Sequence, residues 1–517
     1  MSPAAAEQSV WNRTAAPPGA GVLLASMLAL GFAIRLYVVL TQTYVVFIDE
    51  TFQYFEQAHR LVFGTGIVPW EYVDGIRSWL LPGFVAAPMW VASRFGDDPL
   101  LYLRLTRLLC IGASLSVIAV GFFLALRREG RIAAALTAGV CAMWFDLVWF
   151  APAVMTEVLA AHAILVAICL GDRRDICPPR RLAWAGACLG IAFCLRYQYA
   201  PAMAAVALAQ HRLDRERWKF LALGSLAVVV PVLGGLDWLT WGAPFHSVWM
   251  NFARNSLQGI SSAIGTEPAS FYFAYLAHSA WPLPLVACLA VIGATRVPAL
   301  GVAALAVLAT HMLVPHKEVR FIYLTLAAVP ILAGIGFVTL VRLVELRARR
   351  TVLPSAAPVA LLLAAGLSWH NATAELAPRW QFQRASTQSF LAAHRQPDLC
   401  GLGVDDIDLV YSGGYTYLNR DVPLYFARFV ATLTLPDSSV AMRTAVLRHG
   451  QAVDQAPGSS FDAATGRFNY LIADAGSGRP GYTPIACFSD ASRIAGAAPL
   501  CLFRRPGTCG WSGAPGA

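Results

Sequence analysis

The chain has 517 residues, of which 57% are hydrophobic and 13% are charged, and its formal net charge is +9. A soluble globular protein usually carries about a quarter charged residues, so this composition indicates a polytopic membrane protein. The basic residues form short clusters between apolar segments, which the positive-inside rule explains better than nucleic-acid binding does.

Apolar segments that approach the roughly 20 residues needed to cross about 30 Å of hydrocarbon are predicted to be membrane spans. In chain order they are 21–43, 100–126, 132–150, 154–170, 182–196, 197–210, 219–240, 272–293, 297–314, 321–344 and 353–370. Residues 1–20 precede them, are rich in Ala and Pro, and are expected to form a disordered cytoplasmic tail. The first span lacks a convincing cleavage site, so we expect it to be retained.

Residues 78–95 form a further apolar stretch, which either crosses the membrane or lies flat at its surface. Charge decides between these possibilities. If 78–95 lies flat, the basic clusters at 127–131, 172–181, 211–219, 296 and 342–350 all fall on one side of the membrane. This arrangement predicts eleven spans with a cytoplasmic N-terminus. It also places the loops 44–99, 152–157, 241–271 and 315–321 together on the outer side.

From residue 371 the chain changes character. Residues 374–395 could form an amphipathic helix, and short apolar runs follow between Gly, Ser and Asp residues. This pattern predicts a small soluble α/β domain over 371–517. One or two disulfides are expected in an oxidising compartment among Cys400, Cys487, Cys501 and Cys509, and three pairings are open for two bridges.

The loop 44–99 gathers acids, aromatic side chains and cations where the first span ends, and a loop of this length without a role is uncommon. Asp49 and Glu50 come first and are either solvated loop acids or reactive ones. Glu56 and His59 follow at a spacing that puts them on one helical face. Further candidates after the Gly64–Gly66 break are Trp70, Glu71 and Arg77. We expect two short interfacial helices that form a platform over the first span.

Sugar transfer from a phosphate-activated donor requires a base for the acceptor hydroxyl and cations for the departing phosphate. Asp49 is the predicted base, and Glu50 is its substitute. The segment HKEVRF supplies His316, Lys317 and Arg320 at the start of a span, where free backbone N–H groups also favour an anion. Interfacial snorkelling would explain the two longer cations but not the histidine beside them.

Three more ionisable residues lie in or beside apolar segments. Glu157 begins a span and is either a partner of the helix dipole or an accessory acid. Arg196 separates two short apolar segments, so it either binds phosphate or pairs with a buried acid. Arg35, inside the first span, raises the same question.

The segment DETFQYFEQAHRLVFGTGIVPWEYVDGIRSWLLP closely resembles the first lumenal loop of the ALG9/PIG-B mannosyltransferases, glycosyltransferase family 22 of the GT-C superfamily. The matching positions are Asp49, Glu50, Gln53, Glu56, His59, Gly64, Gly66, Trp70, Glu71, Tyr72, Arg77 and Ser78. The segment HKEVRFIYLTLAAVP resembles the HKE-x-RF signature of the same family. The chain departs from the family at Val68-Pro69, where a Thr usually precedes Trp, and at Leu80-Leu81, where an aromatic residue is usual.

The resemblance implies a GT-C fold and an inverting transfer of mannose, or a related sugar, from a polyprenyl-phosphate-linked donor. The acceptor would be a glycan or a lipid-linked glycan, and the unmatched tail together with the Arg- and Ala-rich composition suits a bacterial inner-membrane enzyme facing the periplasm. The family's base is carried over to Asp49 and Glu50. The donor-phosphate region is carried over to His316, Lys317 and Arg320, to which we add Arg196. We expect an acceptor site made by Glu56, His59, Trp70, Glu71 and Arg77.

No metal and no other cofactor is expected, because the donor carries one phosphate that these cations can neutralise. A divalent ion is the alternative, and it would require Asp49, Glu50 and Glu157 to meet. Inversion agrees with the residues, because a single displacement does not need the carboxylate pair, about 5 Å apart, of a covalent retaining mechanism.

The sequence leaves two alternative functions. A transporter or flippase for lipid-linked sugars would place paired charges at the membrane midplane and show inverted repeats, and the sequence shows neither pattern. GT-C enzymes that transfer aminosugars or arabinose share the architecture, but the HKE and WEY motifs favour the mannosyltransferase branch. The acceptor, the linkage and the identity of the sugar stay open.

Overall fold

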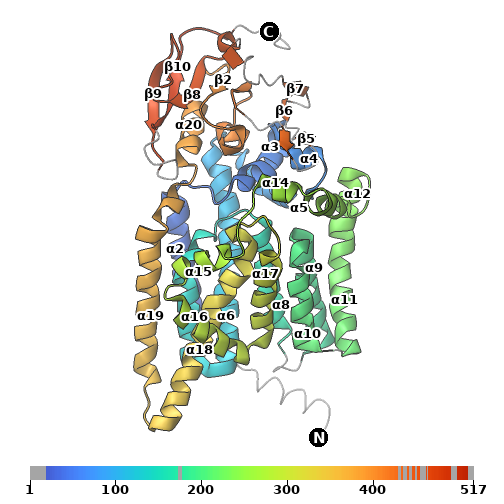
Figure 1. The fold of residues 1–517 in the computed structure, drawn as a ribbon, viewed down its shortest axis with the longest axis vertical. Coiled ribbons are helices and arrows are strands. Elements are labelled where there is room, and N and C mark those ends of the chain that lie inside the picture. Colours follow the sequence, from blue (N-terminus) through green and yellow to red (C-terminus); the bar gives the residue numbers. More distant parts are fainter. Residues whose placement is uncertain are drawn as a thin grey trace.

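In the computed structural model, long helices stand side by side in a bundle, and a region of strands and short helices covers one end of it (Figure 1). The structure describes residues 19–172, 177–212, 214–428, 432–434, 439–441, 445–448, 451–453, 461–462, 464–490 and 498–509. The predicted tail up to residue 18, and residues 173–176 of one predicted basic loop, lie outside these ranges. The longer helices are α2 (Ala20–Thr41), α6 (Pro99–Met143), α8 (Thr156–Leu170), α9 (Pro179–Leu195), α10 (Ala200–His211), α11 (Arg215–Val229), α16 (Leu283–Arg296), α17 (Pro298–Met312), α18 (Tyr323–Ala348) and α19 (Leu353–His370).

Within the described residues, five helical stretches are long and apolar enough to cross a membrane. They are Ala20–Thr41, Pro99–Met143, Arg215–Trp241, Val319–Ala348 and Leu353–Glu375. Phe271–Ser279 and Leu283–Arg296 form a sixth if their bend of 96° is counted within one span. The other predicted spans correspond to shorter helices, so the number eleven stays a prediction. Helix α5 (Leu80–Ala92) is also short, at 13 residues.

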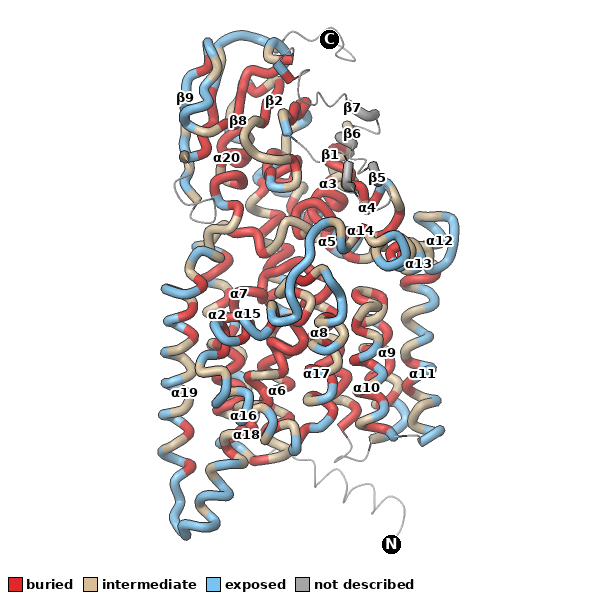
Figure 2. The backbone as a smooth tube through the Cα atoms, in the orientation of Figure 1, coloured by how far each residue is buried: buried red, intermediate tan, exposed pale blue. Residues whose placement is uncertain are grey.

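The outer helices of the bundle expose apolar side chains. Leu362 and Leu363 on α19 are 72% and 65% exposed, and Leu226 on α11 is 56% exposed. Figure 2 shows the same contrast in the bundle, where α11 and α19 carry exposed surface and the inner helices α6 and α8 are largely buried. Such apolar surface requires an apolar solvent, so these faces are suited to contact with lipid.

Helix α6 contains a sharp turn, and its two halves correspond to two predicted spans. Gly130 adopts φ 79° and ψ −167°, which divides the helix within the basic cluster at 127–131. A φ of this sign is accessible to glycine without the steric cost that a side chain would add. The predicted loop between residues 126 and 132 is therefore a single tight turn.

Arg35 lies buried in the bundle and is bonded to backbone carbonyls. Its guanidinium donates to the carbonyl oxygens of Gly31, Cys141, Ala142 and Leu147 at 2.9–3.4 Å. Three of these carbonyls belong to the break between α6 and α7 (Phe145–Trp149), where helix-terminal oxygens lack intrahelical partners. Arg35 therefore has a structural role.

The loop 44–99 folds into short elements over the end of the bundle. It contains a π-helical turn η1 (Glu50–Phe55), helix α3 (Glu56–Phe63), strand β1 (Thr65–Val68), helix α4 (Trp70–Val73) and α5. Gly64 ends α3 in the left-handed conformation that closes many helices. The predicted pair of short helices with a break between them is present as α3 and α4.

Two further connections reach the same end of the bundle. The first comprises η3 (Val230–Gly235), α12 (Leu236–Trp241), α13 (His246–Phe252), η4 (Ala253–Leu257), α14 (Ile260–Ile264) and α15 (Phe271–Ser279). The second is the 3₁₀ turn η5 (Val319–Ile322), which leads directly into α18. The short turn η2 (Tyr197–Tyr199) joins α9 to α10.

After α19 the chain forms a mixed sheet whose strand order is β3-β2-β8-β10-β9. Its strands are β2 (Leu402–Val404), β3 (Leu424–Phe426), β8 (Tyr470–Asp474), β9 (Thr483–Phe488) and β10 (Leu500–Arg504). The remaining elements of this region are η6 (Asn371–Glu375), η7 (Ala377–Gln381), α20 (Arg384–His394), η8 (Leu409–Tyr411), α21 (Gly414–Leu418), β4 (Thr432–Thr434), β5 (Ser439–Ala441), β6 (Ala445–Arg448), β7 (Gln451–Val453) and η9 (Thr465–Arg467). Two disulfides, Cys400–Cys509 and Cys487–Cys501, select one of the three open pairings.

The C-terminal region and the loop 44–99 pack as one unit. Strand β1 of the loop pairs antiparallel with β6, so the two regions share a sheet. They also share a hydrophobic core, in which Phe52 and Phe55 lie with Phe390 and Leu418. A domain boundary at residue 371 stays a prediction. The loop 44–99, which carries most of the candidate residues, is held in place by these contacts with the C-terminal region.

Candidate active site

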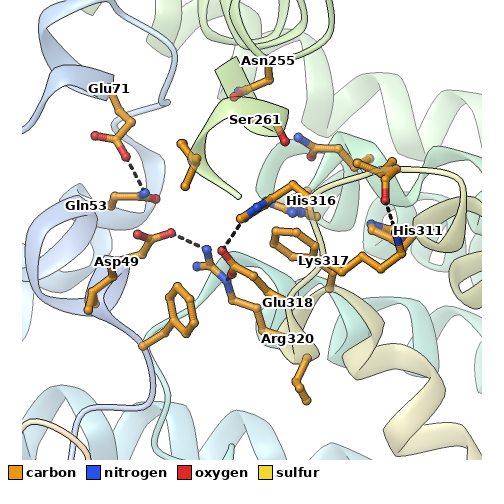
Figure 3. Close-up of a pocket in the computed structure, with 18 of the residues that line it drawn as sticks. Asp49, Gln53, Glu71, Asn255, Ser261, His311, His316, Lys317, Glu318 and Arg320 are labelled. Atoms are coloured by element: carbon orange, nitrogen blue, oxygen red, sulfur yellow. Dashed lines mark hydrogen bonds and ion pairs between the residues drawn. The ribbon is translucent and has the colours of Figure 1, made fainter. Parts of the chain in front are cut away.

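A cavity of about 1700 Å³ lies where the bundle meets the loop 44–99 and the C-terminal region. Eight of the predicted site residues line it: Asp49, Trp70, Glu71, Arg77, Arg196, His316, Lys317 and Arg320. The other four predicted residues, Glu50, Glu56, His59 and Glu157, are not part of its lining. Figure 3 shows Asp49 and Glu71 on one wall, with Arg320 reaching toward them from the opposite side.

Asp49 and Arg320 form the central contact of this site. Asp49 precedes η1, Arg320 belongs to η5, and Asp49 Oδ2 lies 2.5 Å from Arg320 Nη2. The Arg320 guanidinium also donates through Nε to Glu318, and it lies 4.2 Å from the centre of the Phe47 ring. These contacts fix the guanidinium in the cavity wall, where it is 7% exposed.

Arg196 and Glu157 form a second buried ion pair next to the first. Arg196 Nη1 lies 3.1 Å from Glu157 Oε1, and Arg320 Nε lies 3.7 Å from the same oxygen. Glu157 stands in the first turn of α8, as predicted from its position at the start of a span. It therefore connects the two arginines and balances their charge from behind the cavity wall.

His316 and Lys317 line the cavity in different ways. His316 Nε2 lies 2.9 Å from Glu318 Oε1, and this hydrogen bond raises the pKa of His316. Burial alone would raise the pKa of Glu318, but Arg320 and then His316 lower it. Lys317 Nζ instead donates to the carbonyls of Glu267, Val314 and Pro315. Its three protons are thus used to hold the turn against the neighbouring loop.

Glu50 points away from the cavity, although it adjoins Asp49 in the chain. It is 1% exposed, accepts the backbone N–H groups of Val46 and Val154, and lies 3.8 Å from Arg107. Burial raises its pKa, an effect that Arg107 opposes. These contacts tie the loop to the start of α8, so the geometry gives Glu50 a structural role in place of the expected catalytic one.

A metal site made by Asp49, Glu50 and Glu157 does not fit this geometry, because each carboxylate is engaged by a different arginine. Over the residues that the structure describes, no three His, Cys, Asp or Glu side chains cluster as metal ligands would. The residues present therefore do not match an oxygen-ligand cage for a divalent ion.

Glu56 and His59 hold the C-terminal region against the loop, where an acceptor site had been expected. Glu56 accepts hydrogen bonds from the Thr416 N–H at 2.5 Å, the Thr416 hydroxyl at 2.8 Å and the Ile67 N–H at 2.7 Å. Burial raises the pKa of Glu56 to about 7. The two nitrogens of His59 contact the Thr65 carbonyl and Asn419 Oδ1. Both side chains are buried at a joint between two regions of the chain.

Glu71 lines the cavity beside Asp49, and no arginine among the described residues forms an ion pair with it. Its Oε1 accepts a hydrogen bond of 2.9 Å from Gln53 Nε2. Burial, followed by the charge of Asp49, raises the pKa of Glu71 to about 7, and Arg77 acts in the opposite direction. Trp70, which precedes Glu71, packs against Ile76 and Ile260 and presents part of its ring to the cavity.

The C-terminal region supplies cavity residues that were not expected from the sequence. Arg379, Phe382 and Tyr411 line the cavity, and the Arg379 guanidinium lies between the Trp149 and Tyr275 rings at 4.8 and 4.7 Å. For Arg379 and Phe382 the available signal was the basic and aromatic segment PRWQFQR, residues 378–384, which follows soon after the last predicted span. Gln53 was noted as a motif position, but its bond to Glu71 was not expected.

The family model described as the Alg9-like mannosyltransferase family matches residues 26–386, which is more than two thirds of the chain. This chain belongs to the Alg9-like mannosyltransferase family. The matched range contains every predicted site residue and ends within α20, before the mixed sheet.

Individual members of the Alg9-like family match over part of their length. GPI mannosyltransferase 3 of Yarrowia lipolytica is 30% identical over 297 residues, which are 53% of this chain and 55% of that protein. Alpha-1,2-mannosyltransferase ALG9 of Saccharomyces cerevisiae is 26% identical over 369 residues, 65% of this chain and 63% of that protein. The chain thus spans less than two thirds of the length of these relatives.

Among solved structures, ArnT from Cupriavidus metallidurans bound to undecaprenyl phosphate is similar to this Alg9-like protein, with a TM-score of 0.54. The alignment covers 79% of this chain and 86% of ArnT at 14% sequence identity. At this identity the likeness shows a shared fold, the GT-C membrane fold.

Proposed function

We propose that the chain transfers mannose, or a related sugar, from a polyprenyl-phosphate-linked donor to a glycan or lipid-linked acceptor, with inversion at the anomeric carbon. The observation that carries this proposal is the Asp49–Arg320 ion pair on the wall of one large cavity. It joins the two motif segments, so that acids for the acceptor hydroxyl and cations for the departing phosphate face the same space.

The donor phosphate is proposed to bind beside Arg320 and Arg196. Arg320 uses Nε and Nη2 for Glu318 and Asp49, and its Nη1 has no hydrogen-bond partner in the described part of the chain. An unused guanidinium N–H can donate to a phosphate oxygen. His316 is the third cation of this group, and it would act through its charge because its two ring nitrogens contact the Gly265 carbonyl and Glu318. Lys317 would first have to leave its three carbonyl partners.

The isoprenoid part of the donor is proposed to occupy the apolar side of the cavity. Phe271 and Leu313 line this space, and Leu313 is 85% exposed. Ligand cavities with mostly apolar walls and a few polar groups suit such a molecule. The ArnT structure, which has undecaprenyl phosphate bound, supports a polyprenyl phosphate as the carrier.

A single displacement accounts for the proposed inversion. A base takes the proton of the acceptor hydroxyl, and its oxygen forms a bond to the anomeric carbon. The bond from that carbon to the phosphate oxygen breaks, and the electron pair leaves with the phosphate. Asp49, the base predicted from the sequence, and Glu71 are the two acids that face this position from the loop 44–99. Trp70 and Arg77 would contact the acceptor sugar.

We place this reaction at the periplasmic face of a bacterial inner membrane, because the predicted charge distribution puts the loop 44–99 outside. No step of the proposed reaction uses a metal, since the acids that could hold one are engaged by arginines.

The test uses the full-length protein in membrane vesicles with radiolabelled polyprenyl-phosphate-mannose and a panel of glycan and lipid-linked acceptors. We expect label to pass to an acceptor in the anomeric form opposite to that of the donor, with no loss of activity in EDTA. A double variant Asp49→Asn, Glu71→Gln is the inactive control. Movement of the intact donor between leaflets without cleavage would instead identify a flippase and would contradict the proposal.

A further inference from the structure

The two acids on the acceptor side of the cavity have different surroundings (Figure 3). The Asp49 carboxylate is bound directly by the Arg320 guanidinium at 2.5 Å. This contact takes up Asp49 Oδ2 and ties the carboxylate to the guanidinium that faces the proposed phosphate position.

Glu71 has no such partner. No Lys, Arg or His nitrogen among the described residues lies within ion-pair distance of its carboxylate. The donors that face this carboxylate are the neutral Gln53 amide and the backbone N–H of Glu71 itself. The charged groups that act on it are Asp49, which disfavours ionisation, and Arg77, which favours it. Burial is the largest effect and raises the pKa of Glu71 to about 7, close to the value at which a carboxylate both ionises and accepts a proton readily.

Gln53 adds an independent sign that a substrate group belongs beside Glu71. Its amide nitrogen is bonded to Glu71, but its Oε1 is buried and has no hydrogen-bond partner among the described residues. Buried polar atoms are rarely left unpaired, because the loss of solvation costs about 1–3 kcal/mol. The hydroxyl that gives its proton to Glu71 has no second proton, so a neighbouring hydroxyl of the same acceptor sugar would supply the donor that Gln53 Oε1 lacks.

We propose that Glu71, and not Asp49, is the general base that takes the proton from the acceptor hydroxyl. This assignment rests on the proposed sugar transfer. The acceptor O–H bond breaks, its proton moves to the Glu71 carboxylate, and the oxygen forms the bond to the anomeric carbon. The phosphate leaves with the electron pair of the broken carbon–oxygen bond, so one negative charge moves from Glu71 to the phosphate. Asp49 acts as a positioning residue that holds Arg320 toward that phosphate.

The test compares wild type, Glu71→Gln, Glu71→Asp, Asp49→Asn and the control Asp97→Asn, an exposed acid of the same loop. Each full-length variant is assayed with radiolabelled polyprenyl-phosphate-mannose from pH 5.5 to 9, after thermal unfolding has shown that it is folded. In the wild type we expect kcat/KM to fall below about pH 7, because protonated Glu71 cannot act as a base. Asp97→Asn should match the wild type at every pH.

Glu71→Gln should lower kcat by about 10²–10⁴-fold with little change in donor KM. Its residual activity should lack the acid limb of the pH profile, which is the fall in kcat/KM below about pH 7. Glu71→Asp, which keeps a carboxylate, should restore part of kcat and the limb. Asp49→Asn should keep the limb and raise the donor KM. The proposal is overturned if Glu71→Gln keeps the acid limb, or if Asp49→Asn removes it. Absence of transfer by the wild type would instead refute the proposed function, and this assignment with it.

Discussion

Asp49 and Arg320 are 271 residues apart in the chain and form an ion pair of 2.5 Å in the wall of the central cavity. The pair connects the end of the first span to the turn that leads into α18. It therefore joins the two motif segments directly. Glu318 and Glu157 contact the same guanidinium. The positive charge of this region is therefore balanced by acids before any donor phosphate arrives.

A double-mutant cycle on Asp49 and Arg320 should show strong coupling. Asp49→Asn and Arg320→Lys each disturb the orientation of the guanidinium, so each should lower kcat/KM, mainly through a higher donor KM. The double variant should lose less than the product of the two single effects, with a coupling energy of about 1–3 kcal/mol. Steady-state kinetics with a labelled donor measures this quantity. Additive effects would show that the two residues act independently.

The pH dependence of donor binding should report on His316. The hydrogen bond to Glu318 raises the pKa of His316 above its ordinary value of 6.5, so the charged pair is complete at low pH and is lost as the pH rises through the raised pKa. We therefore expect the donor KM of the wild type to increase on the alkaline side of pH 6.5.

In His316→Gln the donor KM should be higher than in the wild type at neutral pH and should not vary over this range. The measurement is donor KM and not kcat/KM, so the titration of Glu71 does not obscure it. Parallel KM profiles for the two proteins would exclude His316 from donor binding.

Local sequence was sufficient for much of the bundle. The predicted spans 21–43, 154–170 and 353–370 lie within a few residues of α2, α8 and α19, because hydropathy along a single helix marks where it begins and ends. Seven of the eight predicted site residues that line the cavity likewise come from the two motif segments. Both kinds of information depend on residues that are close in the chain.

The sequence does not show contacts between residues that are far apart in the chain, nor the direction in which a side chain points. Asp49 and Glu50 are adjacent acids, yet one faces the cavity and the other faces Arg107, and nothing in their residue types distinguishes them. Glu56 and His59 were expected in the acceptor site, but their partners, Thr416 and Asn419, follow 360 residues later in the chain. No local periodicity reveals such a contact.

Glu56→Gln should loosen the joint between the loop 44–99 and the C-terminal region. An amide has one acceptor oxygen, so it cannot receive both the Ile67 N–H and the Thr416 N–H as the carboxylate does. One buried donor left unpaired costs about 1–3 kcal/mol. Limited proteolysis should then cut the C-terminal region faster, whereas Glu375→Gln, at an exposed acid, should not change the rate. Equal rates for the two variants would show that Glu56 does not hold this joint.

Arg35→Met should destabilise the bundle without changing the pH profile of transfer. Methionine has a similar length but no donor, so the Cys141, Ala142 and Leu147 carbonyls would lose their contacts with the guanidinium in an apolar interior. Each unpaired group costs about 1–3 kcal/mol, and the apparent Tm in detergent should fall accordingly. The apparent Tm of Arg35→Lys, which keeps a charged group but has fewer donors, should lie between those of the wild type and Arg35→Met. Arg347→Met, at an exposed position, should have the Tm of the wild type. An unchanged Tm in Arg35→Met, or a shifted acid limb in its residual activity, would mean that the buried arginine serves the reaction and not the break between α6 and α7.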